Sequence, residues 1–182
     1  RGRVCFRGKI AASPYIRLTG LAEKGQTLKA VEIRGVDLQL ESRVSNLSEY
    51  IGEEAWQNFR SGSNQVIFGK GIADHLGVTL GESITLLIPQ TSNSLKVRSP
   101  KRVRLKIVGL LSLGGQIDHG LVLLPLEDAQ KYSDITEGVS GVSIKTTDVL
   151  NAQMIVREAG NTLQVKVYLK SRQQKFGVWY RD

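Results

Sequence analysis

The chain has 182 residues, of which 41% are hydrophobic and 23% are charged, and its formal net charge is +8. This composition argues against intrinsic disorder and is typical of one globular domain or two small subdomains. The positive charge indicates an acidic partner (a protein, anionic lipid or nucleic acid) or serves only solubility. The single cysteine, Cys5, excludes an intrachain disulfide.

Two strands are predicted near the start of the chain. Residues 10–18 form an extended run, and residues 28–34 read as a second strand that Gly35 closes. Lys24 and Gly25 mark a turn between them, so the two strands are expected to pair as neighbours.

Residues 36–50 are expected to be irregular or a short helix, and residues 53–62 have the chemistry of a capped helix. Two glutamates lie at the positive end of the helix dipole, and Arg60 lies at its negative end. Trp56 and Phe59, three residues apart, would share one face, which we interpret as core rather than as a ligand platform.

Residues 65–89 hold a strand–helix–strand signal around which the chain is organised. A short apolar run at 65–68 is followed by a helix at 70–76, with Gly77 in the position of a helix C-cap. Residues 83–88 form a second run of β-formers, which Pro89 ends.

The next part is polar and then basic. Residues 90–99 are expected to form a protruding loop or hairpin tip. Residues 102–110 alternate as a half-buried strand does, with Arg102, Arg104 and Lys106 on the exposed face. A short buried strand at 121–124 and a helix opened by Pro125 follow.

The last third predicts a βαβ unit, with strands at 139–145 and 163–170 and a helix at 148–159. Together with the first strands this unit suggests a ferredoxin-like α+β layer. The aromatic and cationic residues that follow are typical of a membrane interface, and equally of a terminal helix packing on the domain. They are Phe176, Trp179, Tyr180 and Arg181.

Catalytic motifs are weak in this sequence. The Gly-Lys-Gly string at residues 69–71 lacks the remaining residues of a dinucleotide fingerprint or a P-loop, and is interpreted as a tight strand-to-helix turn. His75 and His119 each follow an aspartate, but two histidines without a cluster predict no metal site. Asp118 and His119 are expected to point to opposite faces of a strand. We therefore predict a binding or force-transmitting module without cofactor; an enzyme would need a pocket that joins a histidine to a carboxylate, or a pair of Cys5 with a histidine.

Residues 83–117 contain no aspartate or glutamate. This basic segment suits an acidic protein, lipid headgroups or nucleic acid, and it is also compatible with a solvated strand face beside a loop. It contains no aromatic residue, so a stacking platform for single-stranded nucleic acid is absent from it. We predict no nucleic-acid partner.

Long blocks in order resemble a known family. They include SPYIRLTGL, FGKGIADHLGV, GESITLLIP, PKRVRLKIVGLLSLGGQIDHG, LPLEDAQKY and VSGVSIKTTDV. The chain is similar to the LolC/LolE family of membrane subunits of the bacterial lipoprotein-releasing ABC transporter, and within it to the LolE members. The resemblance covers nearly the whole chain and corresponds to the large periplasmic domain between the first two membrane helices.

The resemblance implies the MacB-like or FtsX-like periplasmic architecture of mechanotransmitting transporters. An α+β, Porter-like subdomain at residues 1–36 and 102–182 would carry an inserted, mainly β, Sabre-like subdomain at residues 37–101. No apolar run approaches the length of a membrane span, and the chain begins at Arg1, so we expect a fragment whose parent has its spans elsewhere.

The implied partners are a LolC-type membrane subunit, the cytoplasmic ATPase subunit LolD, lipoprotein substrates and the periplasmic carrier LolA. ATP hydrolysis would belong to LolD, so this domain would be non-catalytic and would couple that hydrolysis to lipoprotein release. It would lie in the periplasm, on a protein anchored in the inner membrane.

The resemblance also implies candidate contact residues. The segment equivalent to the carrier-gripping hairpin of LolC reads as the LolE version, and its predicted partner-binding residues are Ser94, Leu95, Lys96, Val97, Arg98, Lys101, Arg102 and Arg104. The C-terminal aromatic group would be membrane-proximal. The alternative is a LolC-like or fused LolC/E-type subunit that recruits LolA itself.

Overall fold

The computed structural model of the protein describes residues 9–90, 99–135, 138–146, 154 and 157. The chain divides into two compact units, Ala12–Ser143 and a second that joins Arg1–Ala11 to Ile144–Asp182. Most described residues belong to Ala12–Ser143, which we call the barrel unit. Across the described ranges, every helix is too short or too polar to cross a membrane.

The barrel unit is built on a sheet that closes on itself. The described strands form a seven-stranded sheet in the order β2-β6-β3-β5-β4-β1-β7, and β1 also pairs with β2. That additional pairing joins the two ends of a six-stranded ring, β2-β6-β3-β5-β4-β1, and β7 is added beside β1. The strands are β1 (Lys9–Lys24), β2 (Thr27–Val36), β3 (Gln65–Gly69), β4 (Ser83–Ile88), β5 (Lys101–Leu111), β6 (Leu121–Pro125) and β7 (Gly141–Thr146).

The ring contains both antiparallel and parallel strand pairs. The pairs β1–β2, β1–β4, β4–β5 and β3–β6 are antiparallel, whereas β2–β6 and β3–β5 are parallel. The short contact of β1 with β4 joins Leu21, Ala22 and Glu23 to Leu87, Leu86 and Thr85. These three residue pairs close the ring, because β1 carries β2 on one edge and β4 on the other.

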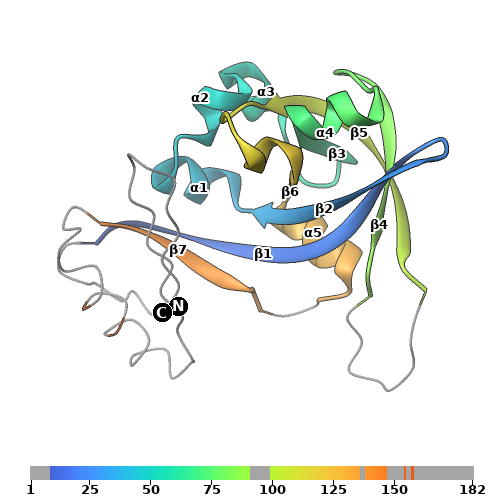
Figure 1. Cartoon of the computed structure of the whole chain (residues 1–182). Coiled ribbons are helices and arrows are strands. Elements are labelled where there is room, and N and C mark those ends of the chain that lie inside the picture. The colour runs from blue at the N-terminus through green and yellow to red at the C-terminus, as the bar shows by residue number, and fades with distance from the viewer. Residues whose placement is uncertain (1–8, 91–98, 136–137, 147–153, 155–156, 158–182) are drawn as a thin grey trace. The chain divides into compact units, whose positions relative to one another are not determined.

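The helices pack against the ring in two groups, and each group contributes to a different hydrophobic core. Residues of α4 (Lys70–Leu76) and α5 (Leu126–Ser133) join the inward side chains of the strands in one core. Helices α1 (Leu38–Val44), α2 (Leu47–Ile51) and α3 (Glu53–Asn58) lie together on one side of the barrel unit (Figure 1). Leu47, Trp56 and Phe59 pack there in a second core with outward residues of β3, β5 and β6.

The alternation predicted for residues 102–110 is confirmed, and β4 alternates in the same way. In β5, Val103, Leu105 and Ile107 are buried while Arg102 and Arg104 between them are exposed. In β4, Ile84, Leu86 and Ile88 face the core. Each fully buried aliphatic side chain contributes about 1.5–3 kcal/mol through apolar burial, so this period-two pattern fixes which face turns inward.

The first predicted hairpin is confirmed, and its first strand is longer than predicted. β1 continues to Lys24 because its residues pair with β2 up to Lys24 and Thr27. Gly25 then turns the chain with a φ of 60°, a conformation that glycine adopts without steric cost. The strand predicted at 139–145 is found as β7, beginning at Gly141.

The helix predicted at 53–62 is shorter than expected, and Arg60 lies beyond it. α3 ends at Asn58, and Phe59 is its extended C-cap. The chain leaves the helix because the Arg60 N–H donates to Gln65 Oε1 at 3.0 Å and the Gly62 N–H donates to the Asp128 carboxylate. Residues 36–50, predicted to be irregular or a short helix, contain α1. Its N-cap, Asp37, accepts hydrogen bonds from the N–H groups of Gln39 and Leu40.

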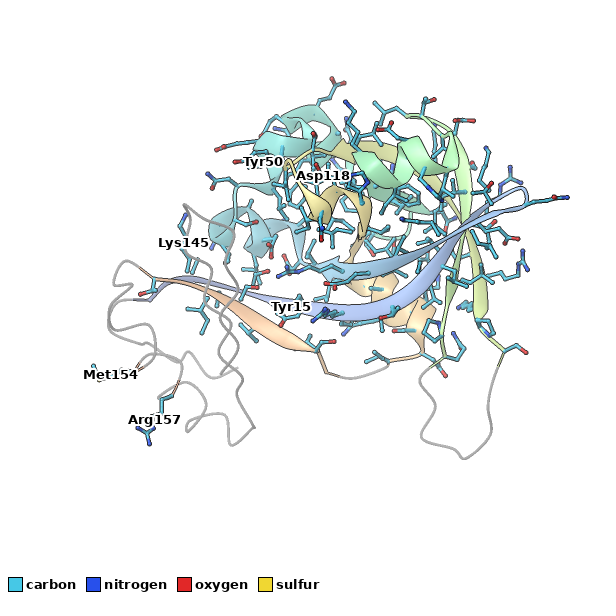
Figure 2. The ribbon with its side chains drawn as sticks, viewed as in Figure 1. Tyr15, Tyr50, Asp118, Lys145, Met154 and Arg157 are labelled. Carbon is cyan, nitrogen blue, oxygen red and sulfur yellow. The ribbon has the colours of Figure 1, made fainter. Side chains whose placement is uncertain are left out.

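The strand predicted around Asp118 and His119 is not found, and this prediction was wrong. These residues form a 3-10 turn, η1 (Gln116–His119), in which the buried Asp118 carboxylate accepts from the N–H groups of Leu113 and Gly114 at 2.8 and 2.9 Å. The turn forms because those two backbone donors need an acceptor inside the protein. Figure 2 shows Asp118 close to α4.

The barrel unit extends across both predicted domain boundaries. Strands β1, β5 and β6, from the ranges assigned to a Porter-like part, pair with β3 and β4, from the range assigned to a Sabre-like part. The overall α+β class is confirmed. Of the predicted βαβ unit, the structure describes β7 and helical positions at Met154 and Arg157, and the rest lies outside the described residues.

Candidate partner-binding surface

The predicted contact segment joins β4 to β5. The two strands pair antiparallel from Ser83–Lys106 to Ile88–Lys101, so the polar segment between them connects a hairpin, as expected. Ser94, Leu95, Lys96, Val97 and Arg98 lie outside the described residues. The membrane-proximal group, Phe176, Trp179, Tyr180 and Arg181, also lies outside them.

The three described candidates on β5 have different surroundings. The Lys101 ammonium lies 5.7 Å from the centre of the Tyr132 ring and donates to the Lys131 carbonyl at 3.4 Å. Arg102 forms an ion pair with Glu23 of β1. Arg104 is exposed and has no ion pair within the described part of the chain. Arg104 is therefore the candidate whose charge is most available to a partner.

The ion pair of Arg102 with Glu23 is partly exposed to solvent. The arginine side chain is 61% exposed and the glutamate side chain 23% exposed. Exposed pairs of this kind contribute about 0–1 kcal/mol, because water screens the attraction and two long side chains lose freedom. The pair orients Arg102 across β4 rather than stabilising the fold.

Outward side chains of three strands form one surface beside Arg104. Leu21, Leu87 and Arg102 are neighbours across β1, β4 and β5, and Glu23, Thr85 and Arg104 form the next row. Leu21 is 40% exposed. The surface is thus mixed, with an apolar row and unpaired positive charge at its β5 side. The predicted site omitted Lys106, which the same alternation places on this exposed face.

A second charged contact holds the β1–β2 hairpin to the turn before β4. Lys24 Nζ lies 3.4 Å from Glu82 Oε1, and Glu82 Oε2 accepts from the Thr79 N–H at 2.7 Å. The Thr79 backbone N–H, and then Lys24, lower the pKa of the Glu82 carboxyl. Glu82 therefore acts as a structural anion at the edge of the surface, not as an acid–base group.

The two histidines belong to different elements of the fold. His75 lies in the last turn of α4 and His119 ends η1. The His119 ring packs against Gly71, where a Cβ atom would collide with it. Among the described residues no group of three or more histidine, cysteine, aspartate and glutamate side chains is positioned to hold a metal ion. Cys5 lies outside the described residues.

The family of this chain follows from its sequence and is supported by its fold. Residues 7–162 match the MacB-like periplasmic core domain, and the chain belongs to that family. Its fold resembles the extracellular domain of the noncanonic ABC-type transporter YknZ from Gram-positive bacteria. That likeness has a TM-score of 0.52 and 16% identity, and it covers 87% of this chain and 79% of the other.

Two curated relatives have more informative names. The chain is 34% identical over 171 residues to the lipoprotein-releasing system transmembrane protein LolE of Haemophilus influenzae, covering 93% of this chain and 41% of that protein. It is 30% identical over 148 residues to the transmembrane protein LolC of Xylella fastidiosa strain 9a5c, covering 81% of this chain and 35% of that protein. The chain thus spans about two-fifths of the length of these relatives.

Proposed function

We propose that this chain is the periplasmic domain of a LolE-type membrane subunit of a lipoprotein-releasing ABC transporter. The observation that carries the proposal is the 34% identity to LolE over 93% of the chain, against 30% identity over 81% of the chain for LolC. Membership of the MacB-like periplasmic core family supports a periplasmic position on a protein of the inner membrane.

In this proposal the domain transmits force and contacts partners, and it does not hydrolyse ATP. The cytoplasmic subunit LolD supplies ATP hydrolysis, a LolC-type subunit pairs with the parent protein, and lipoproteins leave the inner membrane for the carrier LolA. A ring-closed sheet supports such a role, because a packed, closed barrel moves as a rigid body rather than bending at an open edge.

The test of this proposal is complementation with the full-length parent protein. Rescue of growth in a bacterial strain depleted of LolE, but not in one depleted of LolC, is the expected result. Rescue of the LolC-depleted strain alone would replace the proposal with the LolC-like alternative, and rescue of neither would contradict both. The 30% identity to LolC supports the LolC-like alternative as the second candidate.

Binding to purified LolA separates the same two candidates in vitro. The LolC periplasmic domain serves as the positive control. We expect this chain not to bind LolA under conditions in which the control binds. Clear binding by this chain would assign residues 90–104 to a carrier-gripping role and favour the LolC-like or fused subunit.

The β5 cations are proposed to contact a partner during release. Replacing both Arg102 and Arg104 with glutamate should preserve the fold and reduce lipoprotein release by the reconstituted transporter. Because Arg102→Glu also breaks the pair with Glu23, Arg104→Glu alone and Glu23→Gln alone are the matched variants. Unchanged release by the double variant, with normal expression, would refute this role of the β5 surface.

A further inference from the structure

Strand β7 (Gly141–Thr146) lies beside β1 but outside the six-stranded ring (Figure 1). β4 meets β1 at Leu21–Glu23, whereas Ser140, directly before β7, contacts β1 at Tyr15 and Arg17. The two contacts occupy different stretches of β1. β7 can therefore leave β1 without breaking the strand pairs that close the ring.

Burial holds β7 less firmly than it holds the strands of the ring. All five residues of β6 are buried, as are four of the five residues of β3. None of the six residues of β7 is buried to that degree, and Val142 is 46% exposed. Because apolar burial supplies most of the stability of a strand within a sheet, β7 gains little stability from this source.

Polar and aromatic contacts attach β7 and the residue before it to β1 and β2. The Ser140 N–H donates to the Tyr15 carbonyl, and the Arg17 N–H donates to Ser140 Oγ, both at 2.9 Å. Arg34, on β2, reaches across β1 and donates from Nη2 to Ser143 Oγ at 3.0 Å. Its guanidinium carbon lies 4.7 Å from the centre of the Tyr15 ring. We call Tyr15 and Arg34 together the clasp.

The clasp fits β7 closely but is incompletely hydrogen-bonded. The Tyr15 hydroxyl packs against Gly141, where a Cβ atom would collide with it. The Arg34 Nε atom is buried and has no hydrogen-bond partner within the described part of the chain. A buried donor without an acceptor has lost its hydration, and this cost offsets part of what the hydrogen bond to Ser143 contributes. The clasp therefore holds β7 by shape and by weak polar contacts.

β7 also carries one of the covalent connections between the two compact units. The chain passes from one unit to the other between Ala11 and Ala12, within β1, and between Ser143 and Ile144, within β7. β1 is fixed in the ring by its pairing with β2, which begins at Tyr15. Of the two connections, the one through β7 is therefore the one whose attachment can change.

We propose that β7 is a releasable strap, which detaches from β1 and from the clasp as one segment while the six-stranded ring stays closed. Release frees residues 141–143 to extend the connection to the second unit, whereas docking of β7 keeps that connection short. The strap is a device of the fold itself, and it does not depend on which transporter subunit the parent protein is.

Hydrogen–deuterium exchange of the 182-residue chain, followed by mass spectrometry, tests the strap. We expect the amides of residues 141–146 to exchange through a local opening that low urea concentrations do not accelerate, while those of β3 and β6 require global unfolding. Arg34→Ala removes the donor of the clasp and should accelerate exchange in β7 about fivefold, without changing exchange in β3 and β6. Gly141→Ala, which places a methyl group against the Tyr15 ring, should accelerate exchange of the same amides.

Arg17→Ala is the matched control, because the Arg17 guanidinium pairs with Glu32 and the backbone N–H that binds Ser140 is retained. It should leave exchange in β7 unchanged, and thermal unfolding verifies that each variant is folded. Exchange of β7 only through global unfolding would overturn the proposal. It would also be overturned if Arg34→Ala left exchange in β7 as in the parent chain, or accelerated exchange in β3 and β6 as much as in β7.

Discussion

The Asp128 carboxylate on α5 accepts hydrogen bonds from the backbone N–H of Gly62, at 2.9 Å to Oδ1 and 3.1 Å to Oδ2. Gly62 has a φ of 77°, in the left-handed region that glycine tolerates. The contact joins residues 66 apart in sequence and fixes the segment after α3. It therefore links the segment that follows α3 to the core side of α5.

Replacing Asp128 with alanine should destabilise the protein by about 1–3 kcal/mol, because the Gly62 N–H and the Ser61 hydroxyl lose their charged acceptor. Urea unfolding followed by circular dichroism measures the change. Glu127→Ala, the neighbouring residue on the same helix, has an exposed side chain and should change stability by less than about 0.5 kcal/mol. Equal effects of the two substitutions would contradict the role assigned to Asp128.

Gly71→Ala should destabilise the protein by about 1–3 kcal/mol, since a Cβ atom there would overlap the His119 ring and force η1 away from α4. Gly120→Ala is the control, because nothing lies within 4 Å of a Cβ atom at that position. Thermal unfolding of both variants compares them directly. A Gly71→Ala protein as stable as the parent would show that η1 does not pack on α4 in solution.

The stability of the protein should fall in alkaline solution through Tyr132. Burial, and then the negative charge of Asp128, raise the pKa of the Tyr132 hydroxyl above its ordinary value of 10.0. A pKa raised in the folded state gives stability that is complete below pH 10.0 and is lost as the pH rises through the folded value. Unfolding measured across this range, with tyrosinate absorbance, should show a shallower loss for Tyr132→Phe. An identical pH slope in parent and variant would exclude Tyr132 as the source.

The stability contributed by Glu82 should be lost in acid. The Thr79 N–H, and then Lys24, lower the pKa of the Glu82 carboxyl from its ordinary value of 4.5. A lowered folded pKa gives stability that is present above pH 4.5 and is lost as the pH falls through the folded value. Glu82→Gln should therefore have a melting temperature that varies less with pH in this acidic range. Glu49→Gln, on the exposed surface of α2, is the control and should keep the slope of the parent protein.

Local structure was predictable where the residues of a single segment determine its conformation. The helix α4 spans Lys70–Leu76 as predicted, and Gly77 ends it in the left-handed conformation with a φ of 63°. The alternation of β5 correctly predicted that Arg102 and Arg104 are exposed. Trp56 and Phe59 are buried, as predicted, although Phe59 lies just beyond the end of α3. In each case a periodic pattern or a glycine decides the outcome within a few residues.

The parts that were mispredicted depend on distant partners. α3 stops at Asn58 because Gln65 and Asp128 bind the backbone that follows it, and no signal within residues 53–62 reports those acceptors. Asp118 was predicted to lie in a strand, but its carboxylate accepts hydrogen bonds from the N–H groups of Leu113 and Gly114, and this contact forms a turn instead.

The sequence alone determined the strand faces, the α4 helix and the basic character of β5, because side-chain periodicity and glycine conformations act over short distances. Its ordered blocks also identified the family to which residues 7–162 belong. Only the tertiary structure decided that β1 closes the sheet against β4, that Arg102 is paired with Glu23 while Arg104 is not, and that Gln65 lies beside Lys106. These relationships join residues far apart in the chain, and they exist only once burial of the core has brought their strands together.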